Sequence, residues 1–255
     1  MKKRTALVTG ASSGIGAVFA RELARDGYAV TCVARSRDKL EGLVTELGSG
    51  HRILVADLAA RDQLQLVAAD VERSGYSLLV NNAGYGIYGR FEEIALDRQE
   101  HLMTVNMNAL VRLSHAFLKK AVAGDALINV SSALSLLTYP GGAVYAATKA
   151  FVTNFTESLW YENRDRGVYV MALLPGVTET QFHAMATGDA SAVHRMKSYP
   201  PEVVVKRALA TLKARKAPTV ISGPLYRFLT FLNTRLMSRK VMITIMGKGS
   251  AGLKK

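Results

Sequence analysis

Residues 5–16, "TALVTGASSGIG", carry an apolar run directly into a glycine-rich turn, and the amphipathic run "AVFARELARDG" follows. Gly10, Gly14 and Gly16 let the chain turn tightly and bring backbone N–H groups close to a diphosphate at the start of the next helix. The spacing Gly-x-x-x-Gly-x-Gly differs from the common Gly-x-Gly-x-x-Gly fingerprint. Ordinary turns also use such glycines. The position of this turn, after a strand and before an amphipathic helix, favours dinucleotide binding.

Short apolar runs rich in β-branched residues alternate with longer amphipathic runs along the rest of the chain. Such runs, apolar on both sides and separated by helices, predict a parallel sheet covered on both faces. The right-handed crossover rule then predicts a doubly wound, Rossmann-like α/β sheet of about seven strands. The expected strands are residues 5–10, 29–34, 52–57, 77–82, 126–131, 168–174 and 218–222, and the expected helices are residues 14–26, 36–47, 60–74, 98–121, 142–166 and 201–215.

The second expected strand ends in "VARSR", where the residue type bears on the choice of cofactor. An acidic residue here would bind the adenosine ribose hydroxyls and select NAD, but Arg35 stands there and Arg37 follows. Because a guanidinium suits a ribose 2′-phosphate, the sequence favours NADP(H) over NAD(H). The alternative for Arg35 is a solvated charge at the start of a helix. Ser13, beside Gly14, adds no basic contact for the phosphate.

Polar and small residues also follow the third and fourth expected strands. Asp57 is placed to accept a hydrogen bond from the adenine amino group. In the "NNAG" segment, Asn82, Ala83 and Gly84 would let a cofactor lie against the backbone, because small side chains permit a close approach. We expect Asn81 to tie neighbouring strands together instead.

The segment "YAATK" places Tyr145 four residues before Lys149. Residues four apart lie on one face of a helix, so these two side chains should be neighbours. A free phenol has a pKa near 10, and acid–base work near neutrality requires a fall of roughly 2–3 units. A neighbouring ammonium favours the phenolate and would lower that pKa. The same spacing also arises by chance on helical surfaces, so the rest of the chain must decide its meaning.

These motifs, in their order and spacing, resemble the short-chain dehydrogenase/reductase family. The resemblance spans about residues 4–223. One such motif is weak, but several in register are specific. At one position the sequence departs from the family pattern, because Thr178 stands where an aliphatic residue is usual. The matching segments are "TGASSGIG", "NNAG", Asn106 in "TVNMNAL", "VSS" at residues 130–132, "YAATK", and "PGVTET" at residues 175–180.

The resemblance implies a reactive tetrad of Asn106, Ser132, Tyr145 and Lys149, with Ser132 rather than Ser131 lying 13 positions before the tyrosine. In the family, Ser132 would bind the substrate oxygen, and Lys149 would also hold the nicotinamide ribose. Asn106 would connect Lys149 to solvent through a water molecule. The cofactor contacts that the motifs imply are Gly10, Ser12, Ser13, Gly14, Ile15, Gly16, Arg35, Asp57, Leu58, Asn82, Ala83, Gly84, Tyr145, Lys149, Pro175, Gly176 and Thr180.

The implied activity is that of an NADP(H)-dependent oxidoreductase that interconverts a small-molecule carbonyl, a ketone or an aldehyde, with an alcohol. Aromatic and aliphatic residues in the implied substrate-covering segment 178–199 point to an apolar or lipid-like substrate, with His183 and His194 as polar loop residues. The alternative is a catalytically silent NADP(H)-binding sensor or scaffold of the same fold, against which the intact tetrad argues. The resemblance also implies a homodimer or homotetramer.

Composition restricts the class of protein further. The chain has 255 residues, 49% of them hydrophobic, and a mean hydropathy of +0.11, which is enough for one substantial core. Cys32 is the single cysteine, so we expect a buried thiol, no disulfide within the chain, and a cytoplasmic location. The N-terminal segment matches neither a signal peptide nor a membrane span, because its apolar run is short and ends at glycine. No spacing of metal ligands is evident, so we expect no metal site.

Charge divides the chain into two parts. Residues 1–201 carry 21 lysines and arginines against 19 acidic residues, whereas residues 202–255 carry 12 against Glu202 alone. The basic segment lacks zinc-ligand spacing and an aromatic platform, so we expect no nucleic-acid partner. We expect residues 1–223 to form a single Rossmann-like catalytic domain and residues 224–255 to form a basic amphipathic extension.

The extension has two faces when it is drawn as a helix. A basic amphipathic helix can lie on an anionic membrane, which would add a peripheral location at a membrane's inner face. The alternatives are that its apolar face closes the substrate pocket or contacts another subunit. At 100° per residue the apolar side holds Leu225, Phe228, Leu229, Leu232 and Leu236, and the polar side holds Arg227, Thr230, Thr234 and Ser238.

Overall fold

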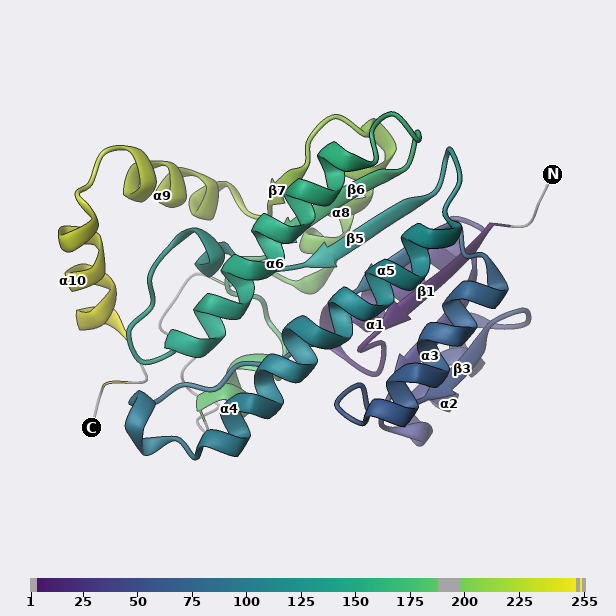
Figure 1. The fold of residues 1–255 in the computed structure, drawn as a ribbon, viewed down its shortest axis with the longest axis horizontal. Coiled ribbons are helices and arrows are strands. Elements are labelled where there is room, and N and C mark those ends of the chain that lie inside the picture. The colour runs from purple at the N-terminus through teal and green to yellow at the C-terminus, as the bar shows by residue number, and fades with distance from the viewer. Residues whose placement is uncertain (1–3, 188–197, 251–252, 254–255) are drawn as a thin grey trace.

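All seven expected strands are present in the computed structural model, which describes residues 4–187, 198–250 and 253. They pair in parallel in the order β3-β2-β1-β4-β5-β6-β7, which is a doubly wound sheet (Figure 1). The strands are β1 (Thr5–Thr9), β2 (Ala29–Ala34), β3 (Arg52–Val55), β4 (Leu78–Asn81), β5 (Ala126–Val130), β6 (Tyr169–Leu174) and β7 (Thr219–Ile221).

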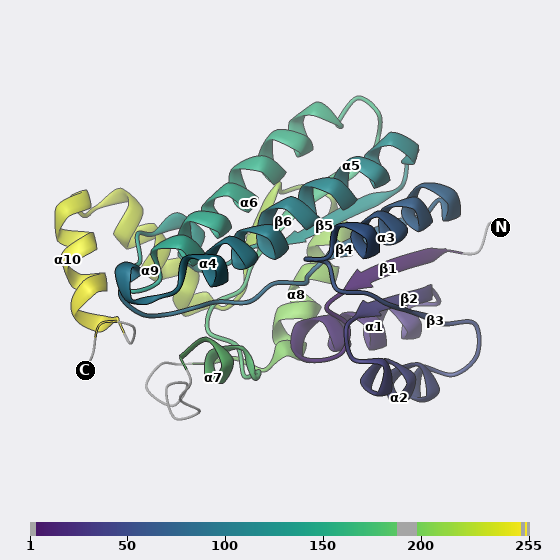
Figure 2. The same cartoon turned by 60° about the horizontal axis from the view of Figure 1, so that its bottom comes forward.

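Helices cover both faces of this sheet, as the apolar strands require (Figure 2). One face carries α1 (Gly14–Arg25), α2 (Arg37–Leu47) and α8 (Pro201–Ala214), and the other carries α3 (Arg61–Ser74), α5 (Leu110–Lys120) and α6 (Ala143–Glu162). The expected helix at 98–121 begins as α4 (Leu96–Met103) and reaches α5 through a π-helical turn, Thr104–Ala109. Shorter elements are the 3₁₀ turns Phe91–Glu93 and Ala133–Leu136, and α7 (Phe182–Thr187).

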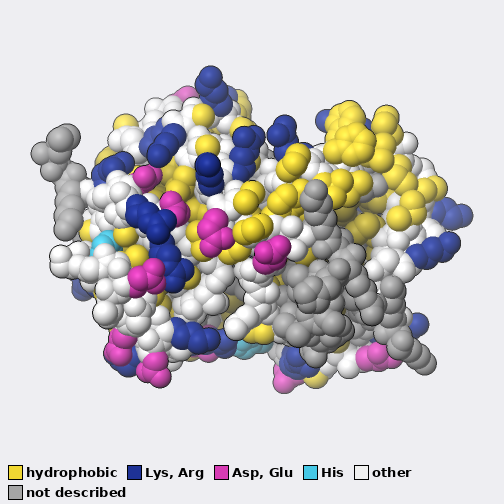
Figure 3. Space-filling view, turned by 180° about the vertical axis from the view of Figure 1, so that it is seen from behind, with side chains coloured by type: hydrophobic (Ala, Val, Ile, Leu, Met, Phe, Trp, Pro, Cys, Tyr) yellow, Lys and Arg dark blue, Asp and Glu magenta, His cyan; other side chains and the backbone are white. Residues whose placement is uncertain are grey.

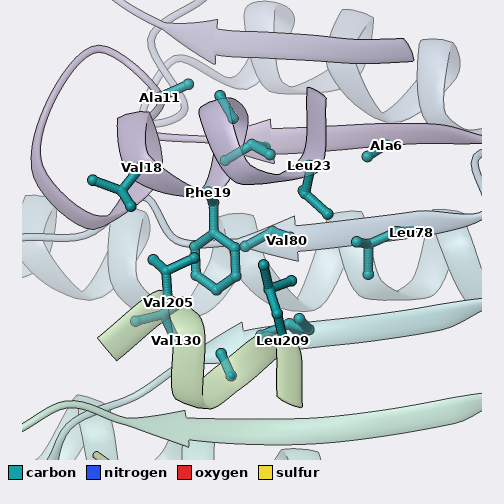
Figure 4. Packing of buried hydrophobic residues seen from close by; sticks show 14 of the residues in the cluster. Ala6, Ala11, Val18, Phe19, Leu23, Leu78, Val80, Val130, Val205 and Leu209 are labelled. Atoms are coloured by element: carbon teal, nitrogen blue, oxygen red, sulfur yellow. The ribbon is translucent and has the colours of Figure 1, made fainter. Parts of the chain in front are cut away.

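The core follows from the two-residue period of the strands. In β1, Ala6 and Val8 join one hydrophobic cluster while Leu7 joins the cluster on the other face. In the first cluster, Phe19 of α1 packs among Val80 of β4 and Val205 of α8 (Figure 4). Burying each such large side chain contributes about 1.5–3 kcal/mol, so this layer fixes α1 and α8 on the sheet.

The order of the strands places the candidate site. Strand order reverses between β1 and β4, and ligands of doubly wound sheets bind at the carboxyl ends of the strands beside this reversal. Gly10 follows β1, Asn82 follows β4, Ser131 follows β5 and Pro175 follows β6. The fold therefore brings the predicted motifs, which lie far apart in the sequence, to one edge of the sheet.

The C-terminal extension lies beyond this edge as two helices, not one (Figure 1). They are α9 (Pro224–Arg235) and α10 (Arg239–Gly249). Helix α9 ends at Arg235, and Ser238 is the N-cap of α10, where its side chain accepts a hydrogen bond from the Val241 N–H at 3.4 Å. Within the described residues, none of the helices combines the length and hydrophobicity that crossing a bilayer requires.

The orientation of α9 differs from what its amphipathic pattern would favour. Thr230, which the pattern places on the polar side, is 5% exposed, whereas Phe228 on the apolar side is 62% exposed. The alternative that the apolar face of this helix closes the substrate pocket therefore does not fit, because that face is turned largely to solvent. The protein contacts the opposite face.

Candidate active site

The glycine-rich turn after β1 has the backbone shape that a bound diphosphate needs. Gly10 and Gly14 have φ of +66° and +52°, a region that favours glycine. A Cβ on Gly16 would lie 2.3 Å from the Gly10 carbonyl oxygen, so this position admits no side chain. Ser13 is the N-cap of α1 but makes no side-chain capping hydrogen bond. The first-turn N–H groups thus remain available to an anion, and the residues present fit a dinucleotide.

A hydroxyl that sequence reasoning missed organises the neighbouring turn. Thr9, at the end of β1, accepts hydrogen bonds from the N–H groups of Asn82 and Ala83 at 2.9 and 3.0 Å. The Asn82 amide in turn donates to the Thr9 carbonyl at 2.9 Å. The only sequence signal was a polar residue at the buried end of a strand.

The predicted role of Asn81 is confirmed. Its side-chain amide donates to the Asn129 carbonyl oxygen at 3.0 Å, which joins β4 to β5. It also donates to the Ser114 hydroxyl at 3.1 Å. Asn81 therefore belongs to the scaffold behind the site, while Asn82 faces the glycine-rich turn.

The carboxyl end of β2 presents an exposed arginine. Arg35 is exposed, and no acidic side chain among the described residues pairs with it, whereas Arg37 contacts Glu41 at 3.4 Å. Asp57 is half-buried, and its carboxylate already accepts the Ala59 N–H at 2.9 Å. Arg35 is the cation here that has no partner of its own among the described side chains.

The four residues of the implied tetrad converge at the ends of β4, β5 and α6, and all are buried. The Ser132 hydroxyl accepts the Leu134 N–H at 3.1 Å and lies close enough to the Tyr145 phenol to influence its pKa. The Lys149 Nζ lies 5.9 Å from the centre of the Tyr145 ring and donates to the Val130 carbonyl at 3.0 Å. Helical spacing thus brings the phenol and the ammonium to one place, as the sequence predicted.

The two neighbouring serines occupy different environments. The Ser131 hydroxyl donates to the Lys149 carbonyl at 2.8 Å and also contacts Thr153, so it braces α6 against β5. Ser132 faces the phenol of Tyr145 instead. The structure therefore brings Ser132, and not Ser131, to the tyrosine.

Asn106 lies within the π-helical turn, a feature that often marks functional positions. Its amide donates to the Tyr85 carbonyl at 3.0 Å and to the Thr148 hydroxyl at 3.2 Å. A Cβ on Gly84 would lie 3.0 Å from Asn106 Oδ1 and 3.4 Å from Lys149 Nζ. Asn106 and Lys149 thus border the same narrow space, which Gly84 keeps open.

The segment after β6 closes the other side. The Pro175 carbonyl accepts the Ala133 N–H at 2.8 Å. A Cβ on Gly176 would lie 2.1 Å from the ring of Tyr226, so this ring of α9 rests directly on the glycine. Thr178 donates to the Gly176 carbonyl at 3.0 Å, which gives the unusual threonine a role within the turn. Thr180 reaches the glycine-rich turn, since its Cγ2 would lie 3.0 Å from a Cβ on Gly14.

Aromatic side chains enclose Tyr145. Tyr88 and Phe182 have ring centres 5.9 and 5.5 Å from that of Tyr145, and Tyr139 contacts Tyr88. A cavity of about 10 Å³ beside Tyr145 has room for about one water molecule. Its lining is largely apolar: Ile87, Phe91, Ile94, Leu102 and Val144 contribute with Tyr145. His194 and the side chain of His183 lie outside the described part of the chain.

Comparison with known proteins decides the family. The model of the short chain dehydrogenase family matches residues 4–190. The chain belongs to the short-chain dehydrogenase/reductase family. It is therefore an oxidoreductase of that family, and its relatives include named dehydrogenases and reductases. The tetrad, the glycine-rich turn and the parallel sheet agree with this membership.

Three similar proteins illustrate the likeness. Sulfoacetaldehyde reductase 2 of Chromohalobacter salexigens is 33% identical over 71% of this chain and 75% of that protein. Serine 3-dehydrogenase of Agrobacterium fabrum is 31% identical, over 72% and 76% respectively. A solved short-chain dehydrogenase from Sphingobium yanoikuyae, in complex with NADPH, is 33% identical with a TM-score of 0.80, and the match covers 86% of this chain and 87% of that one.

The electrostatics of this short-chain dehydrogenase/reductase correct one expectation. We expected Lys149, together with the positive nicotinamide of the oxidised cofactor, to lower the pKa of Tyr145; in the protein alone burial raises this pKa to about 12, and the neighbouring Ser132 hydroxyl acts in the opposite direction. Burial also lowers the pKa of Lys149 to about 8. The reason is the enclosure: both groups have lost their water, and desolvation disfavours the charged form of each. In the structure as it stands, Tyr145 is a protonated phenol at neutral pH.

Proposed function

We propose that this protein is an NADP(H)-dependent oxidoreductase that interconverts a ketone or aldehyde with an alcohol, using Asn106, Ser132, Tyr145 and Lys149. The observation that carries the proposal is the meeting of three buried groups: the Tyr145 phenol, the Ser132 hydroxyl beside it, and the Lys149 ammonium 5.9 Å from the tyrosine ring. A hydroxyl, a protonated phenol and an ammonium that meet at the carboxyl edge of the sheet form a proton-donating site where such folds bind their ligands.

Carbonyl reduction needs a proton at the substrate oxygen, and NADPH, when bound, supplies the hydride. Ser132 donates a hydrogen bond to that oxygen, where negative charge develops. Tyr145 transfers its proton to the same oxygen, since a phenol whose pKa lies at or above its ordinary value is protonated at neutral pH. Lys149 uses one N–H on the Val130 carbonyl, so its other N–H groups can reach the cofactor ribose.

The opposite direction, alcohol oxidation, requires the Tyr145 phenolate. Two positive charges favour that form: the ammonium of Lys149 and the nicotinamide of the oxidised cofactor. Asn106 borders the same space as Lys149 and would hold a water molecule that returns protons to it. The cofactor therefore influences the proton balance of the site as well as supplying or accepting the hydride.

The preference for NADP(H) over NAD(H) rests on Arg35. It is exposed at the end of β2, is unpaired among the described acidic side chains, and replaces the acidic residue that would bind a free ribose. The NADPH complex of the Sphingobium yanoikuyae relative supports the same choice. Pro175, Gly176 and Thr180 would border the nicotinamide end.

The named relatives act on chemically different compounds, so they do not indicate the substrate of this protein. We infer the substrate class from the side chains around Tyr145 instead. Aliphatic and aromatic side chains surround Tyr145, which favours a substrate with an apolar body around its carbonyl.

We also propose that two copies associate through α5 and α6. Phe151, which stacks with Phe155 at 5.7 Å on α6, and Tyr161 expose aromatic surface there.

Replacement of Tyr145 tests the proposal. Tyr145→Phe removes the proton donor while keeping the ring, so turnover of a good ketone with NADPH should fall at least ~10²-fold. Fluorescence titration should show NADPH binding within about threefold of wild type. Steady-state oxidation of NADPH on a panel of small polar to large apolar carbonyls supplies the substrate and the rates.

Tyr139→Phe is the matched control, because it removes a phenol oxygen from the same aromatic group. Its turnover should stay near wild type. A Tyr145→Phe enzyme with undiminished turnover would exclude Tyr145 as the acid. A wild-type protein that binds NADPH tightly but reduces no member of the panel would favour the sensor function instead.

A further inference from the structure

Both C-terminal helices are held against the body of the protein by contacts that do not use their large exposed apolar side chains. Tyr226 of α9 rests on Gly176, and its hydroxyl hydrogen-bonds the backbone of Val177. Thr230, one turn further along, is buried. In α10, Met242 is buried and Gly247 lies against Pro140, since a Cβ there would be 3.5 Å from the proline ring. The two helices therefore have a defined orientation on the body of the protein.

This orientation leaves an apolar surface outside. Figure 3 shows hydrophobic side chains gathered over the end of the molecule formed by α9 and α10, with lysines and arginines around them. Contiguous exposed apolar surface, rimmed by polar side chains, marks an interaction site on many folded domains. The residues of this patch, the tail surface, are Phe228, Leu229, Phe231, Leu236, Val241 and Ile245.

Positive charge surrounds the tail surface. The exposed cations of α9 and α10 are Arg227, Arg235, Arg239, Lys240 and Lys248. No ion pair to a described carboxylate is formed by any of these five. The chain from residue 203 to residue 255 contains no aspartate or glutamate at all. The occupant of this surface must therefore be apolar and anionic together.

We propose that α9 and α10 dock this enzyme on an anionic lipid surface. An interfacial helix inserts aromatic and aliphatic side chains among the acyl chains while lysine and arginine meet the acidic headgroups. A second copy of the chain fits less well. A two-fold contact would place one acid-free basic tail against another, and like charges repel.

Docking has a consequence for the orientation of the enzyme. α9 and α10 lie beyond the carboxyl edge of the sheet, the edge that also carries the tetrad (Figure 1). Tyr226 connects the tail surface to Gly176 at the site, and Gly247 connects it to Pro140, which directly follows Tyr139 of the aromatic group. The lipid surface would therefore face the substrate end of the molecule rather than its N-terminal end.

Cosedimentation with vesicles tests the proposal without any measurement of turnover, so its result is independent of the proposed function. The full chain is mixed with phosphatidylcholine vesicles and with vesicles that also contain phosphatidylserine, at low and high salt. Binding should be confined to the anionic vesicles and should fall at least about tenfold at high salt, because added ions screen surface charge. Binding to neither vesicle type would overturn the proposal.

Matched variants locate the contact. Phe228→Ser with Leu236→Ser should reduce anionic-vesicle binding at least about tenfold, because two apolar anchors are lost. The control is Phe91→Ser with Leu66→Ser: those two side chains are 57% and 71% exposed, against 62% and 70% for the tail pair, but they lie outside the tail. Control binding should stay within about twofold of wild type. Equal losses in the two pairs would overturn the assignment to α9 and α10.

Two further experiments test the role of the basic side chains and the possibility that a second copy of the chain covers the tail surface. Arg239→Gln with Lys240→Gln should weaken anionic-vesicle binding and flatten its salt dependence, whereas Lys119→Gln with Lys120→Gln on α5 should change neither. Sedimentation velocity of the Phe228→Ser, Leu236→Ser variant and of wild type measures whether the tail surface holds an oligomer together. The lipid proposal fails if wild type binds neither vesicle type and Phe228→Ser with Leu236→Ser dissociates an oligomer. That result would show that a second copy covers the tail surface.

Discussion

α1 and α9 are both amphipathic helices of 12 residues, yet they turn opposite faces to the protein. α1 buries Phe19 and Leu23 against the sheet. α9 buries Thr230 and half-buries Tyr226, and it exposes Phe228 and Phe231. An apolar stripe shows that a helix has a hydrophobic partner, but the partner of α1 lies within the chain and that of α9 does not.

The largest effect that separates the two helices is expected in stability. Phe19→Ala should lower the free energy of unfolding by about 3–5 kcal/mol, because it leaves a cavity between α1, α8 and the sheet. Phe228→Ala should change it by less than about 0.5 kcal/mol, because its ring is already in water. Urea unfolding at two protein concentrations measures both. A large, concentration-dependent loss in Phe228→Ala would show that the ring is buried between subunits.

The body of the fold could be predicted from sequence because its determinants are local. β1 and β4 are apolar on both sides, and Gly10 and Gly14 have the positive φ that the tight turn after β1 requires. The spacing of Tyr145 and Lys149 is a property of a single helix. Local patterns therefore predict the seven-stranded parallel sheet and the pairing of Tyr145 with Lys149, whereas Asn106 and Ser132 were named from the resemblance to the family.

The features that escaped prediction depend on contacts between distant segments. Tyr226 packs on Gly176, and Phe182 on Tyr145, and no local pattern links these pairs. The rise in the pKa of Tyr145 that burial causes in the protein alone escaped prediction for the same reason. The helical pairing with Lys149 is visible in the sequence, but the enclosure that raises the pKa comes from other elements. Burial of this kind can only be read from the packed structure.

A smaller effect is expected where α9 meets the body. Gly176→Ala would place its Cβ 2.1 Å from the Tyr226 ring, so it should lower the free energy of unfolding by about 1–3 kcal/mol through overpacking. Tyr226→Ala in the same chain should relieve part of that loss, as a double-mutant cycle in urea would measure. Gly42→Ala in α2 is the control, since nothing lies within 4 Å of its Cβ and alanine favours a helix. Additive losses at residues 176 and 226 would mean that α9 is not seated on Gly176.

The smallest effect is expected in the body itself, at the cofactor end, and it shows whether the body keeps its family role independently of the tail. Arg35→Asp replaces attraction for the 2′-phosphate with repulsion, so NADPH should bind at least about tenfold more weakly, or ~1.4 kcal/mol, while NADH changes much less. Arg37→Asp is the matched control, because Arg37 already contacts Glu41 at 3.4 Å. Fluorescence titration of both cofactors gives the dissociation constants. Equal weakening of NADPH and NADH binding, or an equal response to Arg37→Asp, would remove Arg35 from the selection of NADP(H).

The same two variants also separate the body from the tail. Vesicle binding by Arg35→Asp and Arg37→Asp should equal that of wild type, because neither residue lies in α9 or α10. A loss of vesicle binding in these variants would mean that the surface charge of the body, and not the tail, attracts the lipid.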